Sequence, residues 1–119
     1  SYAHPVGCAA AVGAIEVYAR DDLPGNADRV GAALHERLVD LSRRPSTRGA
    51  IRDARGFGLM RCLELDRPVG ALAADLLARG AYAPFRDNLL FLCPPLCLTL
   101  AEAHQVADLL DAAITDFLR

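Results

Sequence analysis

The first part of the chain carries apolar residues at helical spacing. Residues 6–20 are dominated by Ala, Val and Gly, whose small side chains suit close helix packing. After a polar interruption at residues 21–24, apolar residues recur every three or four positions over 30–41, which indicates one face of a second helix. Pro45 disfavours helical backbone at Arg44, so this second helix is expected to end there.

From residue 51 the hydrophobic period changes from helical to alternating. Apolar residues at alternate positions from Phe57 to Leu65 predict one strand with a face on the core, and a sharp bend of the backbone is expected just before it, at Arg55-Gly56. Pro68 suits the first turn of a short helix, which Gly80 would cap at its carboxyl end. Residues 81–85 and 89–93 are then expected to pair as a hairpin, because a turn-prone Arg-Asp-Asn trio joins them.

The last predicted element opens with a capping box. The Thr99 hydroxyl can accept a hydrogen bond from the Glu102 amide, while the Glu102 carboxylate returns to the Thr99 amide. Apolar residues at helical spacing then run from Val106 to Phe117. The order helix, helix, strand, helix, strand, strand, helix predicts an α+β fold, with a small, mostly antiparallel sheet of three to four strands covered on one face by helices. Residues 1–119 are expected to form this single domain.

Composition and charge narrow the classes of partner. Hydrophobic residues make up 53% of the 119 positions and charged residues 24%, as in a folded globular domain. The net charge of -2 provides no broad positive field, so nucleic acid is not an expected partner. No apolar run approaches the roughly 20 residues that span a bilayer, and the first residues lack signal-peptide features. We therefore expect a cytoplasmic protein with no membrane partner.

Residue types that often carry chemistry form no recognisable site in this sequence. The four cysteines stand in apolar segments without a Cys-x-x-Cys pair or a nearby His, so we expect reduced, buried thiols and no metal site: Cys8, Cys62, Cys93 and Cys97. The three histidines lie on separate segments, and the acid pairs suit solvated helix ends. The glycine-containing run at residues 55–58 precedes a strand instead of opening a helix, so it does not predict a phosphate loop. No catalytic residue is predicted.

All 13 basic residues are arginine, and the sequence contains no lysine. A covalent link to a cofactor aldehyde needs a primary amine that can lose its proton, which a guanidinium cannot supply. Any such link must therefore use a lysine from outside these 119 residues.

Three motifs, in order along the chain, resemble those of one known family. Residues 4–11, His-Pro-Val-Gly-Cys-Ala-Ala-Ala, resemble its His-Pro pair and Ala-rich helix. Residues 54–60, Ala-Arg-Gly-Phe-Gly-Leu-Met, resemble its Val-Arg-Gly-x-Gly-Leu-Met run, and residues 92–99 resemble its Pro-Pro-Leu strand end followed by the capped last helix. On these motifs the chain is similar to the C-terminal small domain of class III aminotransferases, which are fold-type-I pyridoxal-phosphate enzymes.

The resemblance implies a homodimeric enzyme that moves an amino group between an amine or amino acid and a keto acid or aldehyde. In this family, pyridoxal 5'-phosphate is held by a lysine and an acid of a large domain, which would precede residue 1. The chain is therefore expected to be the last quarter of the enzyme, inactive and without cofactor by itself. The alternative is a stand-alone α+β binding, regulatory or interaction module. In a solitary domain the small-residue face of the first helix would stay uncovered, and the chain should self-associate there.

The resemblance also singles out site positions. A Thr shortly before the family's His-Pro pair contacts the cofactor phosphate of the neighbouring subunit; it would fall just before Ser1, so Ser1 or Tyr2 is expected near that phosphate. In members that act on α-amino acids, an Arg often stands three residues before the Pro-Pro pair and binds the substrate carboxylate. Phe91 occupies that position here, which favours an amine, ω-amino or less usual substrate over an acetylornithine-like or ornithine-like one. Phe91 is thus a substrate-pocket residue or plain strand core.

Overall fold

Helices and strands alternate in groups along the chain in the computed structural model, which describes residues 3–47 and 49–119. Over these residues the elements are α1 (Pro5–Arg20), α2 (Leu23–Arg43), β1 (Ile51–Phe57), β2 (Met60–Leu65), α3 (Gly70–Ala78), β3 (Phe85–Arg86), β4 (Leu89–Leu92) and α4 (Leu100–Phe117). The strands form one antiparallel sheet in the order β1-β2-β4-β3. The predicted α+β class and antiparallel sheet are confirmed.

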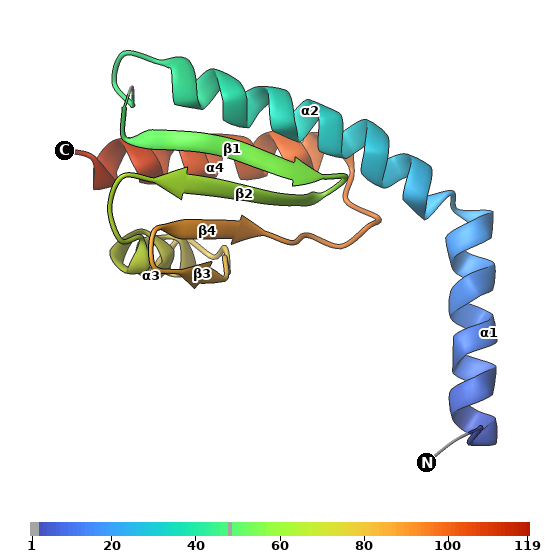
Figure 1. Cartoon of the computed structure of the whole chain (residues 1–119). Coiled ribbons are helices and arrows are strands. Elements are labelled where there is room, and N and C mark those ends of the chain that lie inside the picture. Colours follow the sequence, from blue (N-terminus) through green and yellow to red (C-terminus); the bar gives the residue numbers. More distant parts are fainter. Residues whose placement is uncertain (1–2, 48) are drawn as a thin grey trace.

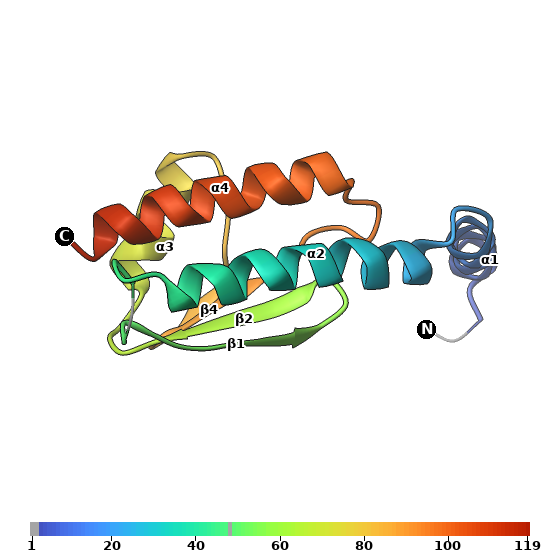
Figure 2. The same cartoon turned by 90° about the horizontal axis from the view of Figure 1, so that it is seen from above.

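Helices α2, α3 and α4 lie on one face of the sheet, as Figure 1 and Figure 2 show. The main core fills the space between these helices and the two central strands, where apolar side chains become inaccessible to water. Its most buried members include Leu34, Leu38, Leu63, Leu65, Leu90, Leu110 and Ile114. No helix in the part of the chain that the structure describes covers the opposite face of the sheet. The prediction that helices cover one face is confirmed.

Residues 51–65 form a hairpin of two strands, so the prediction of one strand from Phe57 to Leu65 is wrong. The chain reverses at Gly58, whose φ is 51°, and Gly56 has a φ of 146°; both angles lie in the region that favours glycine. A Cβ on Gly56 would lie 2.2 Å from the Met60 carbonyl oxygen, closer than a side chain permits. The alternation of apolar residues continues through the turn, and it therefore could not indicate where the strand reverses.

The second predicted hairpin forms, but its first strand is shorter than expected. Only Phe85 and Arg86 pair with β4, whereas residues 81–84 lie outside the ladder. Pro84 has no amide hydrogen to donate, and its carbonyl oxygen accepts a bond of 2.8 Å from the Phe91 amide. The strand prediction is wrong for residues 81–84, because strand structure depends on a neighbouring strand as well as on the local sequence.

Both predicted helix caps are confirmed. The Gly80 backbone adopts a φ of 92°, and its amide donates to the Leu77 carbonyl at 3.0 Å, which ends α3. At the start of α4, the Thr99 hydroxyl accepts from the Glu102 amide at 3.2 Å, and the Thr99 amide donates to the Glu102 carboxylate at 2.8 Å. The first cap fixes the C-terminal end of α3 and the second fixes the N-terminal end of α4, and these two helices pack against each other on the sheet.

Helix α1 projects away from the rest of the molecule (Figure 1). None of its side chains is buried, and α2 follows it after a break at Asp22, which has a φ of 46°. The radius of gyration is 16.7 Å, whereas a compact chain of this length has a radius of about 13.5 Å. Only the part from α2 onward therefore has a core of its own.

Candidate functional site

The candidate site lies on the face of the sheet opposite the helices. Arg55 of β1 pairs with Cys62 of β2, which in turn pairs with Phe91 of β4, so these side chains form one row across three strands. Leu90 and Leu92 point into the core, and successive residues of a strand point to opposite faces. Phe91 therefore points to the face that the helices leave free.

Phe91 lines a shallow hollow of about 300 Å³ on this free face. The side chain is half-buried and belongs to neither cluster of buried core residues. Phe91 stays a predicted substrate-pocket residue, with plain strand core as the alternative. The rest of the lining comes from the β1-β2 hairpin: Arg55, Gly56, Phe57, Met60, Arg61 and Cys62.

Arg55, at the edge of the hollow, is bound to two carboxylates. Its Nη1 donates to an oxygen of Asp53 at 2.7 Å and to an oxygen of Glu64 at 2.8 Å. These hydrogen bonds, first to Asp53 and then to Glu64, raise the pKa of the Arg55 guanidinium. Because one cation faces two anions, the group carries a net charge of about -1. The Arg55 charge is therefore already neutralised and does not act as a free cation for a ligand carboxylate.

Cys62 lies between Arg55 and Phe91 in this row and forms the floor of the hollow. Its residue is 9% exposed, and this burial raises the pKa of the thiol. A raised pKa keeps the thiol protonated near neutral pH, so Cys62 acts as a small apolar group and not as a nucleophile. The hollow thus combines an apolar floor with a rim at which Arg55 is held by the carboxylates of Asp53 and Glu64.

Arg61 points to the other face of the hairpin and holds it against α2. The guanidinium donates from Nη1 to the Gly56 carbonyl at 3.1 Å and from Nη2 to the Gly31 carbonyl at 2.9 Å. The residue is 7% exposed, and burial lowers the pKa of the side chain. A Cβ on Gly31 would lie 2.0 Å from the Gly58 carbonyl oxygen, so helix and turn are in direct backbone contact. This contact positions the strands that carry the hollow.

Ser1 and Tyr2, the expected cofactor contacts, lie outside the described residues. His4 and His104 are exposed, and His35 is half-buried. The acid pairs form ion pairs with arginines instead of facing each other: Asp21 with Arg20, Asp22 with Arg29, Asp108 with Arg37, and Asp111 with Arg44. Within residues 3–47 and 49–119, no three His, Cys, Asp or Glu side chains are grouped in a way that could hold a metal ion.

The prediction of four buried thiols is wrong for three of them. Cys62 is buried, whereas Cys8, Cys93 and Cys97 are exposed. Cys8 lies on α1, which has no buried residue, and the other two flank the Pro-Pro pair where the chain leaves the sheet. Their apolar sequence neighbours predicted that these thiols are buried, but no other described part of the chain covers them.

Among the described helices, none is long and apolar enough to cross a membrane.

The sequence pattern missed the ionic group of Arg55, Asp53 and Glu64. Asp53 and Arg55 are two residues apart on β1, so they share a face, and Glu64 becomes their neighbour only because the chain reverses at Gly58. Opposite charges at alternate positions of β1, with an acidic residue on β2, were a usable signal. That signal has a meaning only once the segment is known to be a hairpin.

Comparisons with known proteins agree with the motifs. The profile of the family "Aminotransferase class-III" matches residues 2–114. Acetylornithine aminotransferase 1 of Bordetella pertussis is 40% identical over 116 residues, which are 96% of this chain and 28% of that protein. The mitochondrial ornithine aminotransferase of Rattus norvegicus is 29% identical over 119 residues, with 96% and 26% of the two chains covered.

A solved structure of an amine transaminase from an uncultivated Pseudomonas species, in its PLP-bound form, matches with a TM-score of 0.85 and 33% identity. The match covers 95% of this chain and 28% of that one. The chain thus spans little more than a quarter of the length of the relatives that it matches.

Proposed function

Because the chain belongs to the class III aminotransferase family, we propose that the whole protein transfers an amino group from an amine or amino acid to a keto acid or aldehyde. The observation that carries this proposal is the family match over residues 2–114, which includes every helix and strand except the end of α4. The chain covers 28% of its relative from Bordetella pertussis. The proposal therefore concerns a longer protein, in which this domain works with others.

Pyridoxal 5'-phosphate is the proposed cofactor of the whole protein, where it supplies the electron sink for amino transfer. The residues present here do not fit a covalent holder of this group, because the sequence contains no lysine. We place that lysine in a large domain of the same protein and regard residues 1–119 as its small domain, inactive by itself. Ser1 and Tyr2 stay proposed neighbours of the cofactor phosphate in the adjoining subunit.

A homodimer is the proposed assembly, and α1 is the feature that supports it. Val6, Val12 and Ile15 are 71%, 55% and 69% exposed, so apolar side chains face water along the helix. A helix that is apolar on all sides is normally buried by its surroundings. We expect the isolated chain to self-associate through α1 in a concentration-dependent manner. Sedimentation that shows a strict monomer at all concentrations would contradict this expectation.

The hollow beside Phe91 favours a substrate without a carboxylate at that point. Its apolar floor offers no ion pair, and Arg55 already shares its charge with Asp53 and Glu64. A carboxylate placed there would lose its hydration and would meet an Arg55 that is already bound to two carboxylates and an Arg61 whose guanidinium donates to the Gly31 and Gly56 carbonyls. The opposing candidate is an acetylornithine-type substrate, and it is favoured by the 40% identity to a protein of that name.

The deciding experiment compares amino donors with the full-length holoenzyme. An aliphatic monoamine and acetylornithine are assayed with the same keto acid, in the natural protein and in a Phe91→Arg variant. We expect the natural enzyme to have the higher kcat/KM with the monoamine. In the Phe91→Arg variant, the ratio of kcat/KM for acetylornithine to that for the monoamine should rise on the order of tenfold, which is the effect of one added ion pair in a partly buried site. Leu100→Arg adds the same charge at a half-exposed position outside the hollow and serves as the control.

The possible outcomes separate the parts of the proposal. A preference for acetylornithine that Phe91→Arg leaves unchanged would refute the role of Phe91 but not the aminotransferase activity. No amino transfer with any donor would refute the activity itself. A stoichiometric, borohydride-fixed cofactor adduct on residues 1–119 would contradict the placement of the lysine in another domain.

The cytoplasm is the proposed location, without nucleic acid or membrane as a partner. Three exposed free thiols support it, because such thiols persist in reducing compartments: Cys8, Cys93 and Cys97. Fractionation of cells that produce the full-length protein tests the location directly.

A further inference from the structure

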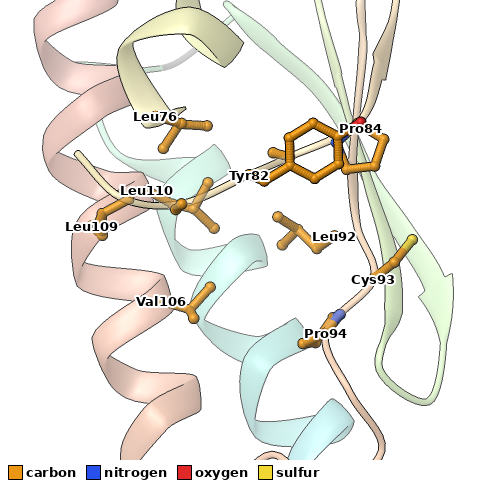
Figure 3. Close-up of a pocket in the computed structure, with 11 residues that line it drawn as sticks. Leu76, Tyr82, Pro84, Leu92, Cys93, Pro94, Val106, Leu109 and Leu110 are labelled. Atoms are coloured by element: carbon orange, nitrogen blue, oxygen red, sulfur yellow. The ribbon is translucent and has the colours of Figure 1, made fainter. Parts of the chain in front are cut away.

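The segment that follows β4 has few hydrogen bonds to fix its position. Figure 3 shows Cys93 and Pro94 leaving the sheet after Leu92, beside a hollow of about 360 Å³ whose lining also includes residues of α4. Pro94 and Pro95 have no amide hydrogen to donate. We call residues 93–98 the exit segment, because the chain leaves the sheet there on its way to α4.

Among the described residues, Asn26 alone joins the exit segment to another element by hydrogen bonds. Its side-chain Nδ2 donates to the Leu96 carbonyl at 2.8 Å and to the Leu98 carbonyl at 3.0 Å. Within the segment, the Leu98 amide donates to the Pro95 carbonyl at 3.0 Å and closes a turn. The Asn26 side chain therefore holds this turn at two points.

Asn26 is itself fixed at the start of α2. Its backbone amide donates to the Asp22 carbonyl at 2.9 Å, and the next residue, Ala27, is buried. Ala27 belongs to a small second core cluster with Leu59, from the turn of the β1-β2 hairpin, and Leu98 of the exit segment. A side chain on a packed helix is a firm support, whereas a connecting segment without ladder bonds opens easily. We therefore regard Asn26 as the support and the exit segment as the part that it holds.

The exit segment lies beside residues that line the hollow next to Phe91, which we call the Phe91 hollow. Leu96 lines a further hollow of about 440 Å³ together with Phe57 and Met60, at the tip of the β1-β2 hairpin. Phe57 and Met60 also line the Phe91 hollow, and both are exposed, so neither is held by packing on the described part of the domain. Phe91 itself stands two residues before the exit segment. A shift of the exit segment would therefore change the Phe91 hollow at two places, the end of β4 and the hairpin tip.

We propose that Asn26 is a positioning residue for the substrate: by holding the exit segment, it keeps the Phe91 hollow in the shape that receives the side chain of the amino donor. It acts through the exit segment, without contact to the substrate. The inference rests on the proposed function, because it takes the Phe91 hollow as part of the substrate pocket. It extends that pocket to a residue at the start of α2, on a different element from Phe91.

The test uses the full-length holoenzyme and two aliphatic monoamines, one with a side chain long enough to enter the Phe91 hollow and one with a shorter side chain. Asn26→Leu keeps the volume of the side chain and removes both hydrogen-bond donors. We expect KM for the longer amine to rise about fourfold for each methylene group that loses its contact with the hollow. The value of kcat should not change, because this contact is the same in the ground state and the transition state. KM for the shorter amine should also stay the same.

Asn88→Leu is the matched control. The Asn88 Nδ2 also donates to a backbone carbonyl, that of Leu65, at 2.9 Å, but at the opposite end of the pairing between β2 and β4. Both variants should lower the urea concentration at the unfolding midpoint, but only Asn26→Leu should separate the two amines. Asn26→Asp, whose ionised carboxylate accepts hydrogen bonds and donates none, is the second variant if Asn26→Leu does not fold.

Site-resolved hydrogen exchange of the full-length protein gives a readout that does not need activity. We expect the Leu98 amide to exchange on the order of tenfold faster in Asn26→Leu, because the two bonds that hold its turn are lost. Asn88→Leu should leave this rate unchanged.

The outcomes separate this proposal from the proposed function. An unchanged KM for the longer amine in the Asn26 variants, or an equal rise for both amines, would overturn the proposal and leave Asn26 a structural role alone. Unchanged exchange of the Leu98 amide would overturn it as well, whether or not the protein transfers amino groups. No amino transfer by the natural protein, together with faster Leu98 exchange in Asn26→Leu, would count only against the proposed function.

Discussion

Replacing Gly31 with Ala is expected to destabilise the domain, although Ala is the better helix former. Gly31 lies in α2 where the helix meets the turn of the β1-β2 hairpin. The added Cβ would lie 2.0 Å from the carbonyl oxygen of Gly58 and 2.3 Å from its carbonyl carbon. Both are backbone atoms, so the whole turn must move by about 1 Å to reach an ordinary contact distance. That movement also breaks the bond of 2.9 Å from Arg61 to the Gly31 carbonyl.

The steric cost outweighs the gain in helix propensity. Forcing an extra methyl group into a packed site costs about 1 to 3 kcal/mol. Losing the hydrogen bond of the buried Arg61 guanidinium costs roughly 1 kcal/mol more, while Ala in place of Gly returns about 1 kcal/mol. We expect Gly31→Ala to lower the free energy of unfolding by about 2 kcal/mol, which corresponds to a drop of roughly 8 °C in Tm for a domain of this size.

Urea unfolding of the 119-residue chain, followed by far-ultraviolet circular dichroism, measures this loss. Gly13→Ala is the matched control, because Gly13 is also inside a helix but a Cβ there would meet no atom within 4 Å. The control should raise the helix content of α1 without lowering the unfolding midpoint. A midpoint for Gly31→Ala at or above that of the natural chain would refute the reasoning, since it would mean that the turn yields at no cost.

Three further predictions concern single side chains. Thr99→Ala should lower the free energy of unfolding by about 1 kcal/mol. The Thr99 amide and hydroxyl lower the pKa of Glu102, so the ionised carboxylate contributes to the free energy of unfolding. This contribution is fully present above the pKa of Glu in the unfolded chain and is lost as pH falls through the lower pKa of the folded state. A series of urea titrations at decreasing pH tests it. Arg61→Met should destabilise less than Arg61→Ala in the same assay, because Met fills space that Ala leaves empty, whereas both variants lose the hydrogen bonds to the Gly31 and Gly56 carbonyls. Cys62 should react with maleimide more slowly than Cys97, because burial raises its pKa; equal rates would contradict this.

Helix ends could be predicted from the sequence because their causes are local. The hydrogen bonds between Thr99 and Glu102 join residues three apart, and the φ of Gly80 follows from its missing side chain. The reversal at Gly58 has a different cause. It depends on contact with Gly31 on another element, so the alternation of apolar residues on either side could not reveal it.

The candidate site divides in the same way. The position of Phe91 before the Pro-Pro pair could be found from a motif, but its side of the sheet follows from the register of β4 with β2. The ion pairs of Arg55 depend on the hairpin that the sequence pattern did not predict. Residues 81–84 show a third case, in which the local pattern predicts a strand but the residues lie outside the ladder with β4.

The break at Asp22 has a consequence for insertions and deletions. Each residue of an α-helix turns the next by about 100° and advances it by about 1.5 Å. One residue added to the last turn of α1 would therefore rotate the whole exposed surface of that helix by this angle. The core from α2 onward would not change, because α1 buries nothing against it. Such a variant would unfold at the same urea concentration as the natural chain, but the exposed surface of α1 would face a different direction. The number of residues in α1 therefore fixes the orientation of that surface, and stability measurements do not detect a change in it.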